Sequence, residues 1–304
     1  MERRNFIKNI GLTTAVLGVS GASTLSAFGS KKAEPTFNMD FAPHFGMFKN
    51  SAPGGIFDEL RFMADQGFRS LEDNGLLKRS VEDQEKIGKL LNELGMRMGV
   101  FVVDGGDNWK TSLTTGKKEF LDVFLATCRQ SVEASKRVDA KWATVVPGFF
   151  DRNLPMGIQT GNVIDALRKG SEILEPHGLT MVLEPLSDTP DLFLRNADQT
   201  HMICKAVDSP SCKILYDIYH MQRNEGNLIA TMEKTWDEIA YIQIGDNPGR
   251  KEPGTGEIHY GNVFKYVQEK GFKGVMGMEH GNALPGVDGE KALIAAYRNV
   301  DIKN

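Results

Sequence analysis

The fold of this 304-residue chain is decided by TMVLEP at residues 180–185, KILYDIYH at 213–220, YIQIGD at 241–246 and GVMGMEH at 274–280. Each stretch is a short apolar run that ends on a polar side chain. Such runs are typical of buried parallel strands, and the carboxyl ends of these strands meet at one face of an α/β protein. We therefore expect these polar side chains to converge.

Four similar runs precede these stretches in the chain. They cover residues Phe37–Phe41, Ser70–Glu72, Met96–Val103 and Trp142–Pro147. Amphipathic segments alternate with the runs, and the expected helices are Ile56–Gln66, Val81–Leu94, Phe120–Arg137, Val163–Glu175, Ala197–Val207 and Val263–Glu269. A glycine typical of a helix end precedes several runs, at Gly67, Gly95, Gly178 and Gly271.

Eight strand-like runs alternating with helices predict an α/β fold of the (β/α)8 TIM barrel type. An open doubly wound sheet would show the same alternation, but no glycine-rich dinucleotide motif follows the first run. No linker interrupts the series, so we expect one barrel domain over residues 34–304.

The first thirty residues differ from the rest of the chain. An arginine pair, Arg3-Arg4, is followed by a charge-free stretch from Asn9 to Ser30. This layout indicates an export signal and resembles a twin-arginine signal. The stretch is only mildly apolar, which makes it a poor permanent membrane anchor. We expect residues 1–33 to be a signal peptide and the protein to be periplasmic or otherwise exported; a short amphipathic first helix is the alternative.

Composition narrows the classes of function. Apolar residues make up 40% of the chain and charged residues 25%, as in ordinary globular proteins. The net charge is −4 overall and +2 in residues 1–30, so the remainder carries −6, which argues against a nucleic-acid partner. Three cysteines without metal-type spacing predict neither a disulfide framework nor a structural zinc site. A small-molecule partner is expected, and assembly into a homo-oligomer stays open.

Oxygen-bearing side chains end the last four runs: Glu184, Asp217, Gln243 and Glu279. Any one of these acids alone would more often be a helix cap or a surface residue. Three carboxylates buried together are unfavourable unless a cation neutralises them. An all-oxygen set suits a hard ion, so we expect Mg²⁺ or Mn²⁺ as the cofactor.

The sequence YDIYHMQ at 216–222, with EGNL at 225–228, strongly resembles the hydroxypyruvate isomerase family. IQIGD at 242–246 and the loop that follows it are also typical of that family, and the resemblance spans residues 180–280. It implies the xylose-isomerase-like barrel. It also implies that the metal is held by the residues already singled out, namely Glu184, Asp217, Gln243 and Glu279.

The resemblance further implies an aldose–ketose isomerisation, such as that of hydroxypyruvate to tartronate semialdehyde. A proton moves between adjacent carbons through an enediolate, and Glu184 and Glu279 are expected to serve as catalytic acid and base. His220, Arg250 and Glu257 are candidate substrate-binding residues. Their plainer interpretations are a packed loop histidine, an exposed loop arginine, and an acid that braces the loop or begins a helix.

The first half of the chain departs from the family. VVDGGDNW at 102–109 replaces a short His-Asn-Leu-Pro type of segment, and His44, Glu72 and Asn74 are also not the usual residues. We expect these positions to line a different substrate wall. A sugar isomerase or epimerase is therefore the main alternative function, and a non-catalytic periplasmic sugar-binding barrel is a second. A related nuclease is disfavoured by the acidic charge and by the small number of histidines, six in all.

Overall fold

The computed structural model describes residues 34–303. The predicted signal peptide, including Arg3 and Arg4, lies outside the described residues, so its role stays a prediction. Among residues 34–303, no helix is both long enough and apolar enough to cross a membrane.

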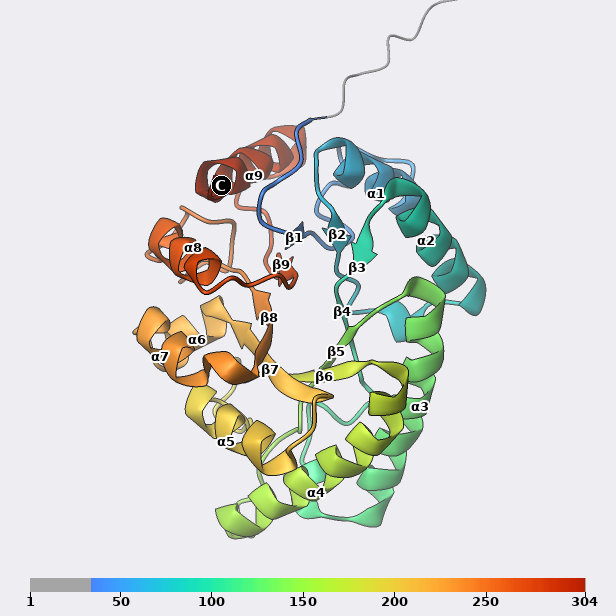
Figure 1. Cartoon of the computed structure of the whole chain (residues 1–304), viewed down its shortest axis with the longest axis vertical. Helices are drawn as coiled ribbons and strands as arrows, with labels where there is room; N and C mark the ends of the chain where they lie inside the picture. The colour runs from blue at the N-terminus through green and yellow to red at the C-terminus, as the bar shows by residue number, and fades with distance from the viewer. Residues whose placement is uncertain (1–33, 304) are drawn as a thin grey trace, which may run out of the picture. The chain divides into compact units, whose positions relative to one another are not determined.

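Short parallel strands form the centre of the described chain (Figure 1). They are β1 (Phe41–Ala42), β2 (Ser70–Leu71), β3 (Arg97–Met98), β4 (Val100–Val102), β5 (Trp142–Val145), β6 (Thr180–Leu183), β7 (Cys212–Asp217), β8 (Ile239–Gln243) and β9 (Met276–Gly277). Each lies in or next to one of the eight predicted runs, and the third run is divided into β3 and β4 at Gly99. A Cβ at Gly99 would lie 2.4 Å from the Tyr241 hydroxyl, so only glycine fits at this division.

The strands follow one another around a closed ring. One sheet has the order β1-β9-β8-β7-β6-β5-β4, β2 pairs with β3, and a parallel bridge joins His44 to Glu72. All of the paired strands are parallel. The predicted TIM barrel is therefore confirmed, and the open sheet is excluded.

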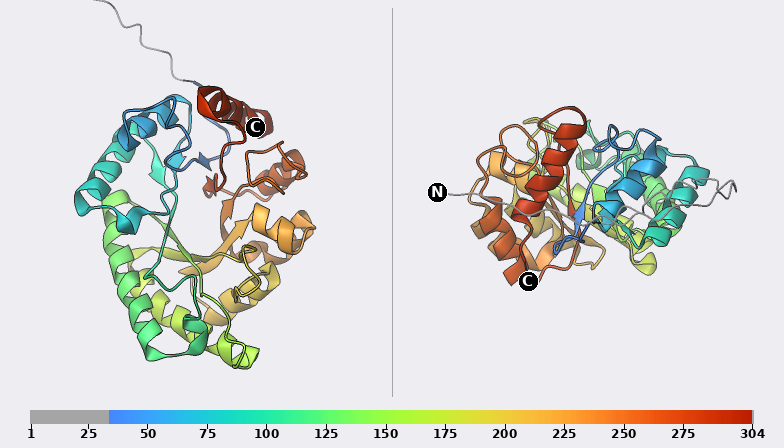
Figure 2. Two further views of the ribbon diagram at one scale, coloured as in Figure 1. Left: turned by 180° about the vertical axis from the view of Figure 1, so that it is seen from behind. Right: turned by 90° about the horizontal axis from the view of Figure 1, so that it is seen from above.

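Helices surround the strands, as Figures 1 and 2 show from three sides. They are α1 (Ile56–Asp65), α2 (Val81–Leu94), α3 (Lys118–Val138), α4 (Met156–Leu174), α5 (Ala197–Val207), α6 (Ile218–Asn224), α7 (Leu228–Thr235), α8 (Tyr260–Glu269) and α9 (Gly286–Val300). The six predicted helices are confirmed within a few residues at most ends. Helices α6, α7 and α9 were not predicted. Gly67, Gly95, Gly178 and Gly271 all have positive φ, as expected for helix ends.

The two ends of the barrel domain are tied together. Both carboxylate oxygens of Asp301, just after α9, accept backbone N–H bonds of 2.9 Å, from Asn38 and Met39 before β1. Phe41 of β1 packs its ring against Tyr297 of α9, with 4.9 Å between ring centroids. These contacts close the ring between its first strand and its last helix, which keeps the ends of β9 and β1 adjacent.

Candidate active site

The predicted ligands lie together at the carboxyl ends of neighbouring strands. Glu184 directly follows β6, Asp217 ends β7, Gln243 ends β8, and Glu279 lies two residues beyond β9. The strand register pairs Asp217 with Gln243 and Gln243 with Gly277. The barrel therefore brings four side chains that are distant in sequence to one point.

Several buried oxygens at this point have no hydrogen-bond partner within residues 34–303. They are Oε1 of Glu184, Oδ2 of Asp217 and Oε1 of Gln243. Potential ligand atoms of Glu184, Asp217, Glu279 and His220 lie within 4.8 Å of one another. Unpaired buried oxygens cost free energy, and a divalent cation would satisfy them together. The residues present thus fit the predicted metal.

The amide of Gln243 is oriented by Glu72, which follows β2. The Gln243 Nε2 donates a 3.1 Å hydrogen bond to Glu72 Oε1, and the buried Gln243 Oε1 is left without a partner in the described chain. Glu72 is fully buried. Burial, together with the nearby Glu279 carboxylate, raises the pKa of Glu72 well above its ordinary value. The expectation that Glu72 and His44 line the substrate wall is wrong: neither is among the described residues that line the cavity, because Glu72 is buried behind Gln243.

Asp217 is held by the first turn of α6. Its Oδ1 accepts the backbone N–H of Tyr219 at 2.7 Å and of His220 at 3.2 Å. This is the helix N-cap arrangement, and it fixes the carboxylate so that Oδ2 points to the shared site. One oxygen of Asp217 is therefore structural and the other is available to a ligand.

His220 lies at the same point, but its hydrogen bonds make it a donor rather than a ligand. The backbone N–H of Ser187 donates to His220 Nδ1 at 3.1 Å, so Nδ1 is the unprotonated nitrogen. Burial lowers the pKa of His220, which favours the neutral ring with its hydrogen on Nε2. That Nε2 lies 3.6 Å from Asp217 Oδ2 and 3.9 Å from Glu184 Oε1. Gln243 is thus the better fourth ligand, and His220 can donate to a substrate oxygen.

The two predicted catalytic acids have shifted pKa values. Burial, then the Glu279 and Asp217 carboxylates, raise the pKa of Glu184 well above its ordinary value. Burial raises the pKa of Glu279 to about 7, although Arg250 acts in the opposite direction. Glu279 Oε1 accepts a 3.1 Å hydrogen bond from Asn74 Nδ2. A carboxyl group with a pKa near neutrality can both accept and return a proton.

Arg250 reaches the site from the loop after β8. Its NH2 donates to Glu279 Oε2 at 2.8 Å and lies 3.6 Å from Asp217 Oδ2. Asp246 organises this loop, since its carboxylate accepts the backbone N–H groups of Gly254 and Gly256 at 2.9 Å and of Ile258 at 3.1 Å. The guanidinium is therefore presented to the site by a braced loop.

Glu257, the remaining candidate, does not lie with the others. Its Oε1 accepts hydrogen bonds from Asn247 Nδ2 and from Gln222 Nε2 at 3.2 Å, and it is absent from the described residues that line the cavity. The bracing interpretation fits this placement better than substrate contact.

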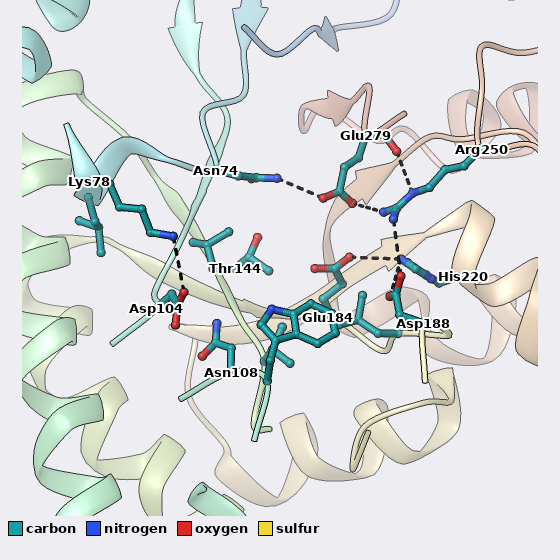
Figure 3. A pocket seen from close by; sticks show the side chains of 15 residues that line it. Asn74, Lys78, Asp104, Asn108, Thr144, Glu184, Asp188, His220, Arg250 and Glu279 are labelled. Carbon is teal, nitrogen blue, oxygen red and sulfur yellow. Dashed lines mark hydrogen bonds and ion pairs between the residues drawn. The ribbon is translucent and has the colours of Figure 1, made fainter. Parts of the chain in front are cut away.

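A cavity of about 280 Å³ opens beside these residues (Figure 3). Its lining is Asn74, Leu77, Lys78, Val102, Asp104, Asn108, Trp109, Thr144, Val146, Glu184, Leu186, Asp188, His220, Arg250 and Glu279. Figure 3 shows Glu279, Arg250, His220 and Asp188 on one side and Lys78, Asp104 and Asn108 on the other. The segment at 102–109 thus lines the pocket, as predicted. Asp188 and Thr144 were not predicted.

Comparisons with known proteins agree with the barrel fold. Residues 60–299 match the family described as xylose isomerase-like TIM barrel. The chain is 32% identical over 167 residues to hydroxypyruvate isomerase from Escherichia coli, covering 54% of this chain and 63% of that enzyme, less than two thirds of its length. It is 34% identical over 245 residues to 2-oxo-tetronate isomerase from Cupriavidus necator, covering 79% of this chain and 92% of that protein. These relatives are named isomerases.

Solved structures share the fold. AP endonuclease, family 2, from Brucella melitensis superposes with a TM-score of 0.72 at 23% identity, covering 85% of this chain and 99% of that one. The 3-keto-D-glucoside 4-epimerase from E. coli superposes with a TM-score of 0.71 at 21% identity, covering 86% and 98%. At these identities the likeness concerns the barrel alone.

Proposed function

The chain belongs to the xylose isomerase-like TIM barrel family, and we propose that it is a metal-dependent isomerase of a small hydroxycarbonyl compound. Its reaction is of the hydroxypyruvate isomerase type, which converts hydroxypyruvate to tartronate semialdehyde. One observation carries this proposal: unpartnered buried oxygens of Glu184 and Asp217 lie within 4.8 Å of a Glu279 oxygen, and Gln243, whose buried Oε1 is also unpartnered in the described chain, is the strand partner of Asp217. The homology to named isomerases supports it.

Glu184, Asp217, Gln243 and Glu279 would hold the cation, with Mg²⁺ or Mn²⁺ suited to an all-oxygen set. When bound, the cation would stabilise negative charge that develops on substrate oxygens. The buried Glu72 supports the set from behind through its hydrogen bond to Gln243.

Glu184 and Glu279 move the proton in this proposal. One carboxylate takes a proton from the hydroxyl-bearing carbon, and a carboxyl group delivers a proton to the adjacent carbonyl carbon. The hydroxyl proton moves to the former carbonyl oxygen, so the product is an isomer and no other reactant is consumed. His220 Nε2–H lies where it can donate to a substrate oxygen, and Arg250 offers a guanidinium to a substrate carboxylate or hydroxyl.

The test is an isomerisation screen in D₂O with Mn²⁺ or Mg²⁺ over hydroxypyruvate and a panel of aldoses and ketoses. We expect isomerised product that carries solvent deuterium on carbon, read by mass spectrometry and NMR. Metal-loaded, folded protein that neither isomerises nor exchanges any compound of the panel would contradict the proposal. Isomerisation without any deuterium incorporation would point instead to a hydride shift.

A sugar isomerase or epimerase is the second candidate. The observation that favours it is the extent of the cavity, which continues from Glu184 to Asn108 and Asp104. We call the group Glu184, Asp217, Gln243, Glu279 and His220 the metal side. A substrate of three carbons held there leaves Asn108 and Asp104 without a role in recognition.

The location of the protein is a proposal from the sequence alone. We infer export through a twin-arginine signal from the Arg3-Arg4 pair and the charge-free stretch after it. Changing both arginines to lysine should retain the precursor in the cytoplasm, as cell fractionation would show. Normal export of that double variant would remove the twin-arginine assignment.

A further inference from the structure

The cavity has a second polar side that the proposed proton transfer does not use. We call it the far wall and define it as Lys78, Asp104, Asn108, Trp109 and Thr144. In Figure 3 Lys78, Asp104 and Asn108 lie across the cavity from Glu279 and Arg250, with Thr144 between the two groups. The wall comes from the chain after β2, the loop after β4 and strand β5.

Thr144 gives the most direct sign of a ligand. Its side chain lines the cavity and the residue is 2% exposed, yet its Oγ1 has no hydrogen-bond partner within the described chain. A buried hydroxyl that lacks a partner costs free energy. A substrate hydroxyl at this position would donate to Oγ1 or accept from it.

The neighbouring groups of the far wall are also suited to hydroxyls. Asn108 donates one amide N–H to Val103 O at 3.3 Å and lies at the edge of the cavity, 9% exposed. Asp104 accepts the Gly106 N–H at 2.8 Å, and its second oxygen lies 3.9 Å from Lys78 Nζ. Together they offer donors and acceptors in close succession, as a polyhydroxylated chain requires.

The charge of the far wall argues against the binding of a substrate carboxylate there. Among the described residues of the far wall, Lys78 is the one with a positive charge. The nearby Asp104 carboxylate would repel an anion that approaches Lys78. Trp109, which is 55% exposed, adds a broad apolar surface to the same wall. Aromatic surfaces pack on the C–H faces of neutral hydroxylated carbons at a low entropic cost.

We propose that the far wall binds hydroxyl-bearing carbons beyond the pair that exchanges the proton. The substrate is then a polyhydroxylated aldehyde, ketone or oxo acid of at least four carbons, and hydroxypyruvate is too short to use the whole site. This inference rests on the proposed isomerase function, and it names the substrate class of that site.

The first experiment compares kcat/KM for hydroxypyruvate with kcat/KM for four- to six-carbon hydroxylated substrates, using the Mn²⁺-loaded full chain. We expect a preference of at least about tenfold for a longer substrate, since a site built to bind hydroxyls discriminates against compounds that lack them. Thr144→Val keeps the side-chain shape but removes the hydroxyl. It should lower kcat/KM for the longer substrate about tenfold, with little change for hydroxypyruvate. Ser171→Ala is the matched control, because Ser171 Oγ is likewise buried and unpartnered in the described chain but lies outside this cavity.

A binding measurement separates this inference from the proposed function. Four- to six-carbon sugar alcohols carry the hydroxyls but have no carbonyl to isomerise, so calorimetry measures binding apart from turnover, and the loss of affinity in Thr144→Val relative to Ser171→Ala reports the contribution of the far wall. We expect binding to the wild-type chain and the Ser171→Ala variant, and weakened binding to Thr144→Val and Trp109→Ala. Sugar-alcohol binding without turnover of any compound would contradict the proposed function and support binding by the far wall. Two results would contradict the role of the far wall and leave the proposed function intact. One is a kcat/KM for hydroxypyruvate at least as high as that for every longer substrate, and the other is an equal loss of kcat/KM for hydroxypyruvate and for the longer substrate in Thr144→Val.

Discussion

The metal side and the far wall differ in how their polar atoms are held. On the metal side, Gln243 is oriented by Glu72, Asp217 by the first turn of α6, and His220 by the Ser187 N–H. On the far wall Thr144 and Asn108 are buried, but the Lys78 side chain is 79% exposed and Trp109 is 55% exposed. A preorganised set of charges suits chemistry, whereas loop side chains can change without disturbing it. Under the two proposals above, the reaction takes place at the ends of β6–β9 and the choice of substrate depends on the chain from β2 to β5.

The largest expected effect tests whether the metal side carries the chemistry. Glu184→Gln and Glu279→Gln keep an oxygen and the side-chain size but remove the basic carboxylate. We expect turnover to fall by about 10² to 10⁴, as is typical for the loss of a positioned acid or base. Initial rates at saturating Mn²⁺ measure this. Glu257→Gln is the control, since Glu257 lies outside the cavity lining, and a Glu279→Gln enzyme with the parental rate would exclude the two-glutamate mechanism.

A smaller effect tests whether the metal side is oriented from behind. Glu72→Ala removes the acceptor of the Gln243 amide, while Glu72→Gln still offers an oxygen. Loss of such an outer partner typically costs about 10- to 100-fold in metal affinity. We expect Mn²⁺ affinity to fall in that range for Glu72→Ala and to fall less for Glu72→Gln, as measured by calorimetry on variants with folded circular dichroism spectra. A Glu72→Ala variant that binds Mn²⁺ with wild-type affinity would show that Glu72 does not orient Gln243 for metal binding.

The smallest expected effect is on the pH dependence of stabilisation by Mn²⁺. It should depend on an acid of the metal side, Glu279, and not on the acid of the far wall, Asp104. The pKa of Glu279 in the folded protein is about 7, above its ordinary value of 4.5. Between these values the folded state holds the proton more tightly than the unfolded state, so this group makes the metal-free protein less stable as pH rises. Metal ligands must also be deprotonated, so Mn²⁺ binds better over the same range.

The rise in Tm produced by Mn²⁺ should therefore grow from about pH 5 to about pH 8, by a few degrees, in scanning fluorimetry. Asp104→Asn, on the far wall, should leave this pH dependence unchanged, whereas Glu279→Gln should flatten it. A Tm increase that is independent of pH in the wild-type chain would show that Glu279 does not exchange its proton for the metal.

The sequence predicted the metal side better than the far wall for a physical reason. Glu184, Asp217 and Gln243 end or directly follow apolar strands, and parallel strands in a closed barrel must bring such ends together. Glu72 also ends a predicted run, but its hydrogen bond to Gln243 joins residues 171 positions apart, and only the folded chain shows that it lies behind Gln243. Thr144 reads as an ordinary strand residue, and only the folded chain shows that its hydroxyl lacks a partner.

Other features depended on contacts that no local pattern encodes. The tautomer of His220 follows from Ser187, which is 33 residues away in the chain. The division of the third run at Gly99 follows from the closeness of the Tyr241 hydroxyl. Helices α6 and α7 were missed because they have only seven and eight residues, and α6 starts directly after the strand that ends at Asp217.

The most direct test of this division of labour is a Mn²⁺ titration by calorimetry on three proteins: the wild-type chain, Asp217→Ala and Trp109→Ala. Asp217 has a buried, unpartnered oxygen and is a proposed metal ligand, whereas Trp109 lies on the far wall. We expect one ion per chain in the wild type and in Trp109→Ala, and a loss of affinity in Asp217→Ala larger than the roughly 10- to 100-fold caused by removing an outer partner. A wild-type chain that binds no Mn²⁺, or an Asp217→Ala variant that binds it as tightly, would contradict the account.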